Sequence, residues 1–382
     1  MQNTKVAILA ACSIMMAPMA LSPVIAEISR AFPDAPTSSV QLITVLPGMI
    51  SLPFSLVAGK LATFMTKKSI TLLSMTVLML GGLIPTVLHD SVAVLLLTSA
   101  IIGVGLGFLG PMPPSLTADY FTGHERSTMM GLQATLVNAG GMVFALLGGL
   151  LARQQWHSTY FIFLLVLPVA LVFALLLPPG KVTQTVAGSG HGLNASVAYL
   201  TVAVFFYGLF STVYFTNIAL YLDATHLGDA ASAGIALAAS NGVGIICGIT
   251  FGPTLRRFER FTLPLALTVA AIGLLMATVD GNLVVLILAS MFLGYGVSTL
   301  MPYGTYTVTQ SVAPAATSLA AAVFMAGISI GSFASPFVVN ALAGLTGDST
   351  EKGRFIVGAI GMVVLTAVIL IHELRRRKTV CV

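Results

Sequence analysis

Charged side chains are scarce in this sequence. Asp, Glu, Lys and Arg together supply 8% of its 382 residues, whereas a soluble domain carries about 25%. Apolar residues supply 57%. A chain with this composition has too few charged side chains to cover a water-exposed surface. Soluble globular folds are therefore excluded, and a membrane protein is indicated.

Cysteine is scarce as well. Cys12, Cys247 and Cys381 are too few for a disulfide framework, and two of them lie inside apolar runs, where we expect them to pack as small apolar residues. No metal-ligand spacing and no nucleophile constellation occurs in the sequence. We therefore expect neither a cofactor nor an enzyme.

Long apolar runs dominate what is present. Each is long enough to cross a hydrocarbon core, which takes about 20 residues of helix, and the runs are continuous, which excludes the alternating strands of a β-barrel. The first run is too long for a secretory signal, contains Pro18 and Pro23, and lacks a cleavage site. The prediction is an all-α membrane protein with twelve transmembrane helices at 5–28, 40–61, 70–88, 92–118, 128–152, 158–178, 195–222, 230–254, 262–279, 283–308, 314–345 and 354–372.

The basic residues are distributed unevenly between the two sides of these spans. Four of them, Arg30, Arg153, Lys352 and Arg354, fall in connections on one side, and thirteen fall on the other. The positive-inside rule then places both termini in the cytoplasm. The net charge of +5 thus reports orientation in a cell membrane, and no nucleic-acid partner is expected. The thirteen are Lys5, Lys60, Lys67, Lys68, Arg126, Lys181, Arg256, Arg257, Arg260, Arg375, Arg376, Arg377 and Lys378.

Glycines recur at half the chain length. At an offset of 191 residues the pairs are Gly82 and Gly273, Gly103 and Gly294, Gly105 and Gly296, and Gly140 and Gly331, with Pro111 and Pro302. Composition alone gives about two glycine matches at any offset, but these fall in corresponding spans. Two like-oriented halves are typical of a transporter. We predict bundles of six helices at 1–178 and 195–382, joined by a flexible cytoplasmic linker at 179–194 that is rich in Gly, Ser and Thr.

The connection after the second span resembles a motif of the major facilitator superfamily. Its sequence GKLATFMTKK, residues 59–68, is similar to the G-x-L-a-D-r-x-G-r-k loop of that family through Gly59, Leu61, Ala62, Lys67 and Lys68. Thr63 stands where the family has its acid, which puts the usual gate interaction in doubt, and Thr66 stands where it has its second glycine. GPTLRRFER, residues 252–260, resembles a degenerate copy. We expect a charged latch here, formed from Gly59, Lys67, Lys68, Asp119, Arg126, Gly252, Arg256 and Arg257.

Glycine motifs of the same family are partly present. The fourth span keeps Gly103, Gly105 and Gly107 but has Ser99 where many proton-linked members have Arg. In the fifth span, three glycines resemble points of the antiporter motif G-x-x-x-G-P-x-x-G-G, without its Gly-Pro core. We expect these glycines to permit close helix packing. The set is Gly103, Gly107, Gly140, Gly148 and Gly149, with Gly331 and Pro336 in the eleventh span.

The resemblance implies two six-helix bundles around a central cavity, and alternating access by rocking of the halves. No Asp, Glu, Lys or Arg lies near the middle of a span, where such a residue usually marks an ion or proton site. Only Glu27, Asp119 and Asp223, at span ends, are candidates for coupling. We therefore expect weak dependence on a pH gradient and a neutral, amphipathic or weakly polar small-molecule substrate.

The seventh span carries the most distinctive polar face. Tyr207, Phe210, Tyr214, Asn217 and Tyr221 follow one another at spacings of 3, 4, 3 and 4, and so share one side of a helix. Hydroxyls and an amide facing lipid would be costly, so this face is expected to meet protein or water. Cavity lining and helix packing are both open for it. The other candidates for substrate contact are Tyr295, Thr299, Tyr303, Tyr306, Met16, Met112, Gln133 and Asn138, for which core filling and interhelical hydrogen bonding are the alternatives.

The favoured function is secondary transport of a small organic solute by a monomer in the lipid bilayer, with export preferred because the fifth-span motif resembles that of efflux members. An uptake carrier or uniporter for a small metabolite is the alternative. A non-transporting receptor would need a large external or cytoplasmic domain, and a channel would need rings of charged or carbonyl groups. Neither is present in the sequence.

Overall fold

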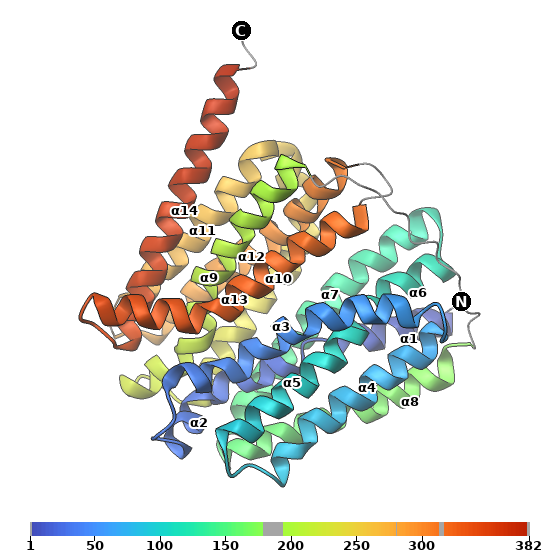
Figure 1. The fold of residues 1–382 in the computed structure, drawn as a ribbon, viewed down its shortest axis with the longest axis horizontal. Helices are drawn as coiled ribbons and strands as arrows, with labels where there is room; N and C mark the ends of the chain where they lie inside the picture. Colours follow the sequence, from blue (N-terminus) through green and yellow to red (C-terminus); the bar gives the residue numbers. More distant parts are fainter. Residues whose placement is uncertain (1, 179–193, 280, 313–316, 380–382) are drawn as a thin grey trace. The chain divides into compact units, whose positions relative to one another are not determined.

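The structure is a computed structural model that describes residues 2–178, 194–279, 281–312 and 317–379. Every regular element in this part of the chain is helical (Figure 1). The predicted linker, apart from Asn194, and Cys381 lie outside the described residues. The elements up to residue 178 are α1 (Gln2–Ser13), η1 (Ala17–Val24), α2 (Ile25–Ala31), α3 (Thr37–Leu61), α4 (Lys67–Leu83), η2 (Ile84–Thr86), α5 (Val92–Leu109), α6 (Met112–Tyr120), α7 (Gly123–Leu151), η3 (Trp156–Leu165) and α8 (Val166–Leu176).

The remaining helices correspond to the six predicted spans of the second half. Eleven helical stretches among the described residues are long and apolar enough to cross a membrane, and α11, with 16 residues, is a shorter apolar helix at the place of the ninth span. The predicted all-α membrane fold is confirmed. The elements are α9 (Ala195–Ala224), α10 (Ala230–Phe258), η4 (Glu259–Phe261), α11 (Thr262–Ala277), α12 (Leu283–Gln310), α13 (Thr317–Leu345) and α14 (Glu351–Thr379).

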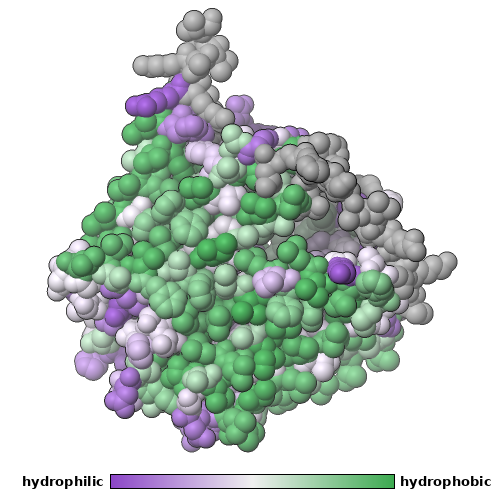
Figure 2. All heavy atoms as spheres, viewed as in Figure 1, coloured by the Kyte–Doolittle hydropathy of each residue, from purple (hydrophilic) through white to green (hydrophobic). Residues whose placement is uncertain are grey.

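The surface of the helices agrees with a lipid environment. Figure 2 shows hydrophobic side chains over most of the visible face, with hydrophilic ones gathered mainly toward its edges. Leu175 on α8 is 82% exposed and Ile249 on α10 is 75% exposed. Side chains of this kind are stable at a surface when hydrocarbon surrounds it. Cys12 and Cys247 are buried, as expected for small packing residues.

The helices form two compact units. The first contains the described residues up to 178 together with Gly228–Ala238, and the second contains the remaining described residues. The first two turns of α10 therefore pack with the first unit, although they follow α9 in the chain. The predicted boundary did not anticipate this assignment of Gly228–Ala238.

In the first unit, two prolines interrupt the first span. Pro18 has no N–H to donate to the carbonyl of Ile14, which accepts instead from Ala17 N at 3.1 Å, and the chain continues as the 3-10 helix η1. Pro23 lies inside η1 and cannot donate to Ala20. One apolar run of the sequence thus contains three elements, α1, η1 and α2.

Helix α7 packs against this interrupted span through two glycines. The Cα of Gly140 lies against the carbonyl of Ser13, and the Cα of Gly148 lies against the carbonyl of Ala20, to which Pro23 cannot donate. A Cβ at either position would collide with the carbonyl oxygen. Such Cα–H···O contacts are individually weak, but they need backbones in close approach.

The second unit repeats this arrangement. Gly331 on α13 lies against the carbonyl of Phe205 on α9, as Gly140 on α7 lies against Ser13 on α1. The pair Gly103 and Gly294 also has matching partners, since Gly103 meets α3 at the carbonyl of Pro47 and Gly294 meets α10 at the carbonyl of Ser240.

The other two repeated pairs differ from each other. Gly105 meets α4 at Leu78 and Gly296 meets α11 at Ala270, which are again corresponding spans. Gly82, however, accommodates the ring of Phe163 from η3, whereas Gly273 meets Ala289 of α12. The half-length glycine repeat therefore encodes corresponding close helix approaches at three of its four positions.

The glycine contact of α7 is testable on that helix alone. We expect Gly140→Ala to lower the thermal unfolding temperature in detergent, because the new methyl group collides with the backbone of Ser13 and overpacking costs about 1–3 kcal/mol. Gly131→Ala is the matched control, since a Cβ there meets no atom within 4 Å. It should be neutral or stabilising by up to about 1 kcal/mol. Equal unfolding temperatures for the two variants would contradict the packing role.

Candidate functional site

The connection between α3 and α4 is held to the rest of the first unit by its two lysines. Lys67 Nζ donates to Asp119 Oδ2 at 2.6 Å, and the Lys67 side chain is only 11% exposed. Lys68 Nζ donates to the carbonyls of Ala174 at 2.6 Å and Leu177 at 2.5 Å. Lys68 thus places a positive charge at the C-terminal end of α8, where the helix dipole is negative.

The two threonines at departures from the family motif have local roles. Thr66 caps α4 by accepting from Ser69 N at 3.2 Å, which a glycine could not do with a side chain. Thr63, at the place of the family's acid, is half-buried and donates to Lys60 O at 2.7 Å. The ion pair of this loop therefore runs through Lys67 and Asp119.

A second ion pair joins α1 and α7 at the same end of the first unit. Lys5 Nζ lies 2.5 Å from Glu125 Oε1 and 5.7 Å from the centroid of the Phe121 ring. The other residues predicted to form the latch lie apart from such contacts. Arg126, Arg256 and Arg257 are exposed, and a methyl group added at Gly59 or Gly252 would meet no atom within 4 Å. The gating role of the whole set stays a prediction.

A double-mutant cycle measures the strength of the first ion pair. With Lys67→Met and Asp119→Asn, we expect a coupling energy of about 0.5–1 kcal/mol in thermal or denaturant unfolding, because both side chains are only partly shielded from solvent. A cycle between Asp119 and the exposed Lys60 is the control and should show no coupling. Identical coupling in both cycles would mean that the 2.6 Å contact adds no stability.

At the start of α10, the first unit contains a further ion pair beside a close backbone approach. Arg153 Nε donates to Asp229 Oδ2 at 3.1 Å. Asp229 Oδ1 accepts from Ser232 N and Ser232 Oγ, both at 3.0 Å, and so caps α10. Nearby, a Cβ on Gly149 or on Gly234 would collide with the carbonyls of Ala230 and Ala145 respectively. Ion pair and glycines together fix the beginning of α10 on α7.

The pKa of Asp229 lies below its usual value. Partial burial acts to raise it, but the hydrogen bonds from Ser232 and the charge and hydrogen bond of Arg153 outweigh that effect. A depressed folded-state pKa stabilises the folded protein above the pKa of the unfolded chain, and this stabilisation is lost as the pH falls through the folded value.

We therefore expect Asp229→Asn to lower the unfolding temperature at neutral pH. The difference from the unsubstituted protein should vanish at a pH below the depressed pKa of Asp229, because the carboxyl is then protonated in both states. Unfolding in detergent between neutral pH and the acid limit of reversibility measures this. Asp34→Asn, at an exposed turn after α2, is the control, and a difference that persisted at the lowest pH would disprove the charge-based explanation.

In the second unit, the polar face of the seventh span is buried. Tyr207 and Tyr214 are 1% and 0% exposed, and their hydroxyls donate to carbonyls of α12, Tyr207 to Leu293 at 3.4 Å and Tyr214 to Leu286 at 2.5 Å. Phe210 packs its ring on Gly361 of α14. These contacts give the three aromatic residues a packing role inside the unit, and their contact with a substrate stays a prediction.

Asn217 has a charged partner that the sequence analysis placed in a connection. Arg354 is 8% exposed, and its Nη1 donates to Asn217 Oδ1 at 3.1 Å and to Glu351 Oε1 at 3.3 Å. Its Nη2 donates to Ser349 O at 3.1 Å. The guanidinium thus joins the first turn of α14 to α9. The spacing of Glu351 and Arg354, three residues apart at the start of a span, was the available signal.

The other predicted contacts divide by exposure. Met112, Gln133, Thr299 and Tyr303 are buried, at 2%, 7%, 3% and 8%, and Gln133 Nε2 donates to Pro113 O at 3.1 Å and to Thr117 Oγ1 at 2.5 Å. Met16 and Tyr306 are exposed, at 38% and 51%. Tyr295 and Asn138 are half-buried, and Asn138 Nδ2 donates to Ala134 O. Each is described within its own unit.

Of the residues considered for coupling, Glu27 has its predicted neighbour as partner, with Arg30 Nη2 at 3.6 Å from Glu27 Oε1. Asp119 pairs with Lys67, and Asp223 is half-buried at the end of α9. Gly107 lies against Ser51 and Phe54 of α3, consistent with its predicted packing role, and Pro336 lies inside α13.

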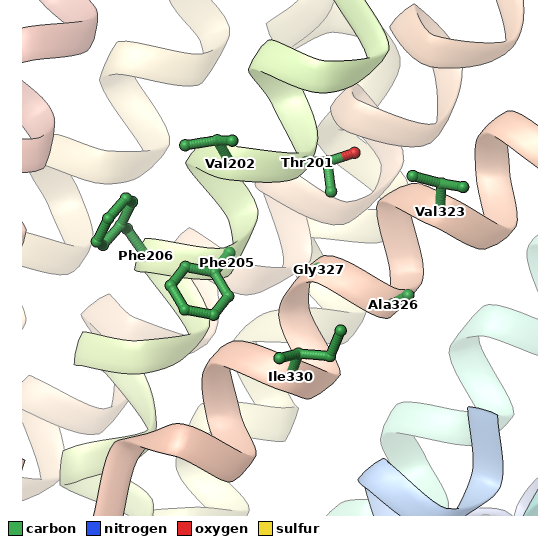
Figure 3. A pocket seen from close by; sticks show the side chains of 8 residues that line it. All are labelled: Thr201, Val202, Phe205, Phe206, Val323, Ala326, Gly327 and Ile330. Carbon is green, nitrogen blue, oxygen red and sulfur yellow. The ribbon is translucent and has the colours of Figure 1, made fainter. Parts of the chain in front are cut away.

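A pocket of about 490 Å³ lies between α9 and α13 of the second unit. Figure 3 shows its lining, with four residues from each helix. Only one of the lining side chains, that of Thr201, has a polar atom. The others are Val202, Phe205, Phe206, Val323, Ala326, Gly327 and Ile330.

The family model of the Major Facilitator Superfamily matches residues 6–198 and 200–380, nearly the whole chain. The chain belongs to the major facilitator superfamily. This membership confirms the resemblance seen in the sequence and makes the protein a multi-pass membrane transporter.

Solved structures of other transporters have the fold of this superfamily member. A variant of the nucleoside transporter NupG superimposes with a TM-score of 0.81 at 13% identity, covering 96% of this chain and 98% of the other. The POT family transporter PepTSo superimposes with a TM-score of 0.78 at 11% identity, covering 99% and 98%. These identities establish a common fold. None of the curated protein sequences compared with this chain matches it.

Two features of this transporter had no motif in the sequence. Arg354 was assigned to a connection because charged residues usually lie outside the hydrocarbon core, and its partner Asn217 is 137 residues distant in the chain. The pocket depends on small residues, Ala326 and Gly327, beside aromatic ones on another helix. Apolar residues of these types are common in every span, so composition could not single them out.

Proposed function

We propose that this major facilitator protein moves small uncharged or amphipathic organic solutes across the cytoplasmic membrane by alternating access, with export as the preferred direction. The observation that carries the proposal is the placement of charge. Ion pairs of the described residues lie at helix ends, as with Lys67 and Asp119 or Arg153 and Asp229. The polar groups within the predicted lining are hydroxyls, amides and thioethers.

Charge placement bears on substrate class because a charged solute inside the bilayer needs a compensating charge. The one deeply buried cation described above, Arg354, is already bound to Asn217 and Glu351. Hydroxyls and aromatic rings instead suit a solute with an apolar body and a few hydrogen-bonding atoms. A neutral metabolite meets this description as well as a drug-like molecule does, so uptake is the second direction that the same chemistry supports.

Placement of the carboxylates also bears on coupling. A proton-coupling group has to change its protonation as access alternates, and Glu27 and Asp119 are each paired with a basic residue near a helix end. Neither lies in the middle of a span. Transport that does not depend on a proton gradient follows from this arrangement.

The test uses purified full-length protein in proteoliposomes. A thermal-shift screen of uncharged metabolites and drug-like compounds first finds a solute that stabilises the protein, since binding to the native state raises its unfolding temperature. We expect counterflow of that labelled solute, absent from protein-free liposomes, with an initial rate that changes less than about twofold when nigericin collapses the pH gradient.

Two outcomes would count against the proposal. Complete loss of concentrative transport on collapse of the pH gradient would contradict the absence of proton coupling. A screen in which only strongly charged compounds stabilised the protein and were transported would contradict the substrate class.

A further inference from the structure

We propose that the pocket between α9 and α13 binds the apolar, ring-sized part of an amphipathic organic solute. This inference rests on the proposed function, because it names the part of the second unit that recognises such a solute. The residues that form the pocket are Thr201, Val202, Phe205 and Phe206 on α9, and Val323, Ala326, Gly327 and Ile330 on α13 (Figure 3).

Size and lining indicate a small organic molecule. The volume of about 490 Å³ falls within the roughly 300–1,000 Å³ that is typical of small-molecule sites. Phe205 and Phe206 supply aromatic faces, and their rings meet edge to face with centroids 5.2 Å apart. Aromatic faces of this kind favour a planar ring as partner. A charged group would be desolvated here without compensation, which excludes ions as ligands.

One polar atom of the lining lacks a partner. Thr201 Oγ1 is buried and has no hydrogen-bond partner among the described residues. Other helical threonines of this unit donate to the carbonyl four residues earlier, as Thr216 does to Thr212 and Thr268 does to Pro264. An unpaired buried hydroxyl is unfavourable. A ligand that brings one hydrogen-bonding atom beside its apolar body removes this cost.

The pocket arises where the two halves of the sequence diverge. At the 191-residue offset, Ala326 corresponds to Thr135 and Gly327 corresponds to Leu136, so the second half has the smaller side chain at both positions. Gly327 also sets the helix spacing, because a Cβ there would lie 2.7 Å from the carbonyl oxygen of Thr201. The internal repeat does not require these small residues, and a binding site accounts for them.

A lipid acyl chain is the competing occupant, because Val202 is 55% and Ile330 is 42% exposed at the edge of the pocket. An acyl chain offers no hydrogen-bonding atom to Thr201 and no flat ring to Phe205. The unpaired hydroxyl and the aromatic lining therefore favour the solute, and a quenching experiment separates the two occupants.

The experiment places a fluorescent reporter in the pocket. The chain has one tryptophan, Trp156 in η3, so a Trp156→Phe background allows a single reporter at Phe206→Trp. A second reporter at Leu175→Trp, on the 82% exposed position of α8, is the control. The full-length protein is placed in nanodiscs and titrated with 6-bromo-2-naphthol, a two-ring probe with one hydroxyl whose bromine quenches nearby tryptophan.

We expect saturable quenching at position 206 that an excess of 2-naphthol reverses, and linear, non-saturable quenching at position 175. Ala326→Leu should weaken the apparent affinity at least about tenfold by filling the pocket, which corresponds to about 1.4 kcal/mol. Ala341→Leu, at an exposed alanine of the same helix, should leave it unchanged. Thr201→Val should weaken binding of 6-bromo-2-naphthol but not of 2-bromonaphthalene, which has no hydroxyl.

Two results would overturn the proposal. Linear quenching by the naphthol at both reporters would mean partition into the bilayer only. Equal quenching of both reporters by dibromostearoyl phosphatidylcholine, without displacement by 2-naphthol, would mean that lipid fills the pocket.

Binding is measured at equilibrium without a gradient, so the two proposals fail separately. Saturable binding without transport of any uncharged solute would remove the proposed function and leave the site. Transport without saturable quenching would leave the function and remove the site.

Discussion

Close contact between a glycine Cα and a carbonyl oxygen of a neighbouring helix determines how both units are built. Without a Cβ, Gly140 and Gly331 let α7 and α13 approach the first helix of their own half until backbones touch. Apolar side chains give little preference for one helix partner in a hydrocarbon solvent, so contacts of this kind decide which helices associate. The ion pairs at the helix ends, the buried tyrosines and the pocket all depend on that spacing.

The sequence predicted the helices well because hydropathy acts on each span separately. All twelve predicted spans have a helical counterpart, and the repeat at 191 residues has a structural meaning at three of its four glycine pairs. The division of the first span into α1, η1 and α2 was missed, although Pro18 and Pro23 were visible. A proline removes one donor, but whether the helix bends or changes type depends on what lies against the freed carbonyl, here a glycine of α7.

The candidate site was less predictable, because its contacts join residues far apart in the chain. The spacing of Tyr207 and Tyr214 correctly placed them on one face that avoids lipid, but it could not show that α12 supplies the carbonyls they bond. Arg354 was placed in a connection because nothing near it in sequence is a partner except Glu351. The pocket required knowledge of which two helices pack side by side, and its small residues have no distinguishing pattern.

The interrupted first span has a geometric consequence. A 3-10 helix rises about 2.0 Å per residue and an α-helix about 1.5 Å. The eight residues of η1 therefore extend about 4 Å further than they would as α-helix, and successive side chains turn about 20° more per residue. Conversion of η1 to α-helix would shorten the span by that length and rotate α2 by nearly half a turn relative to α1. The two prolines thus set both the reach of the first span and the direction in which Glu27 points.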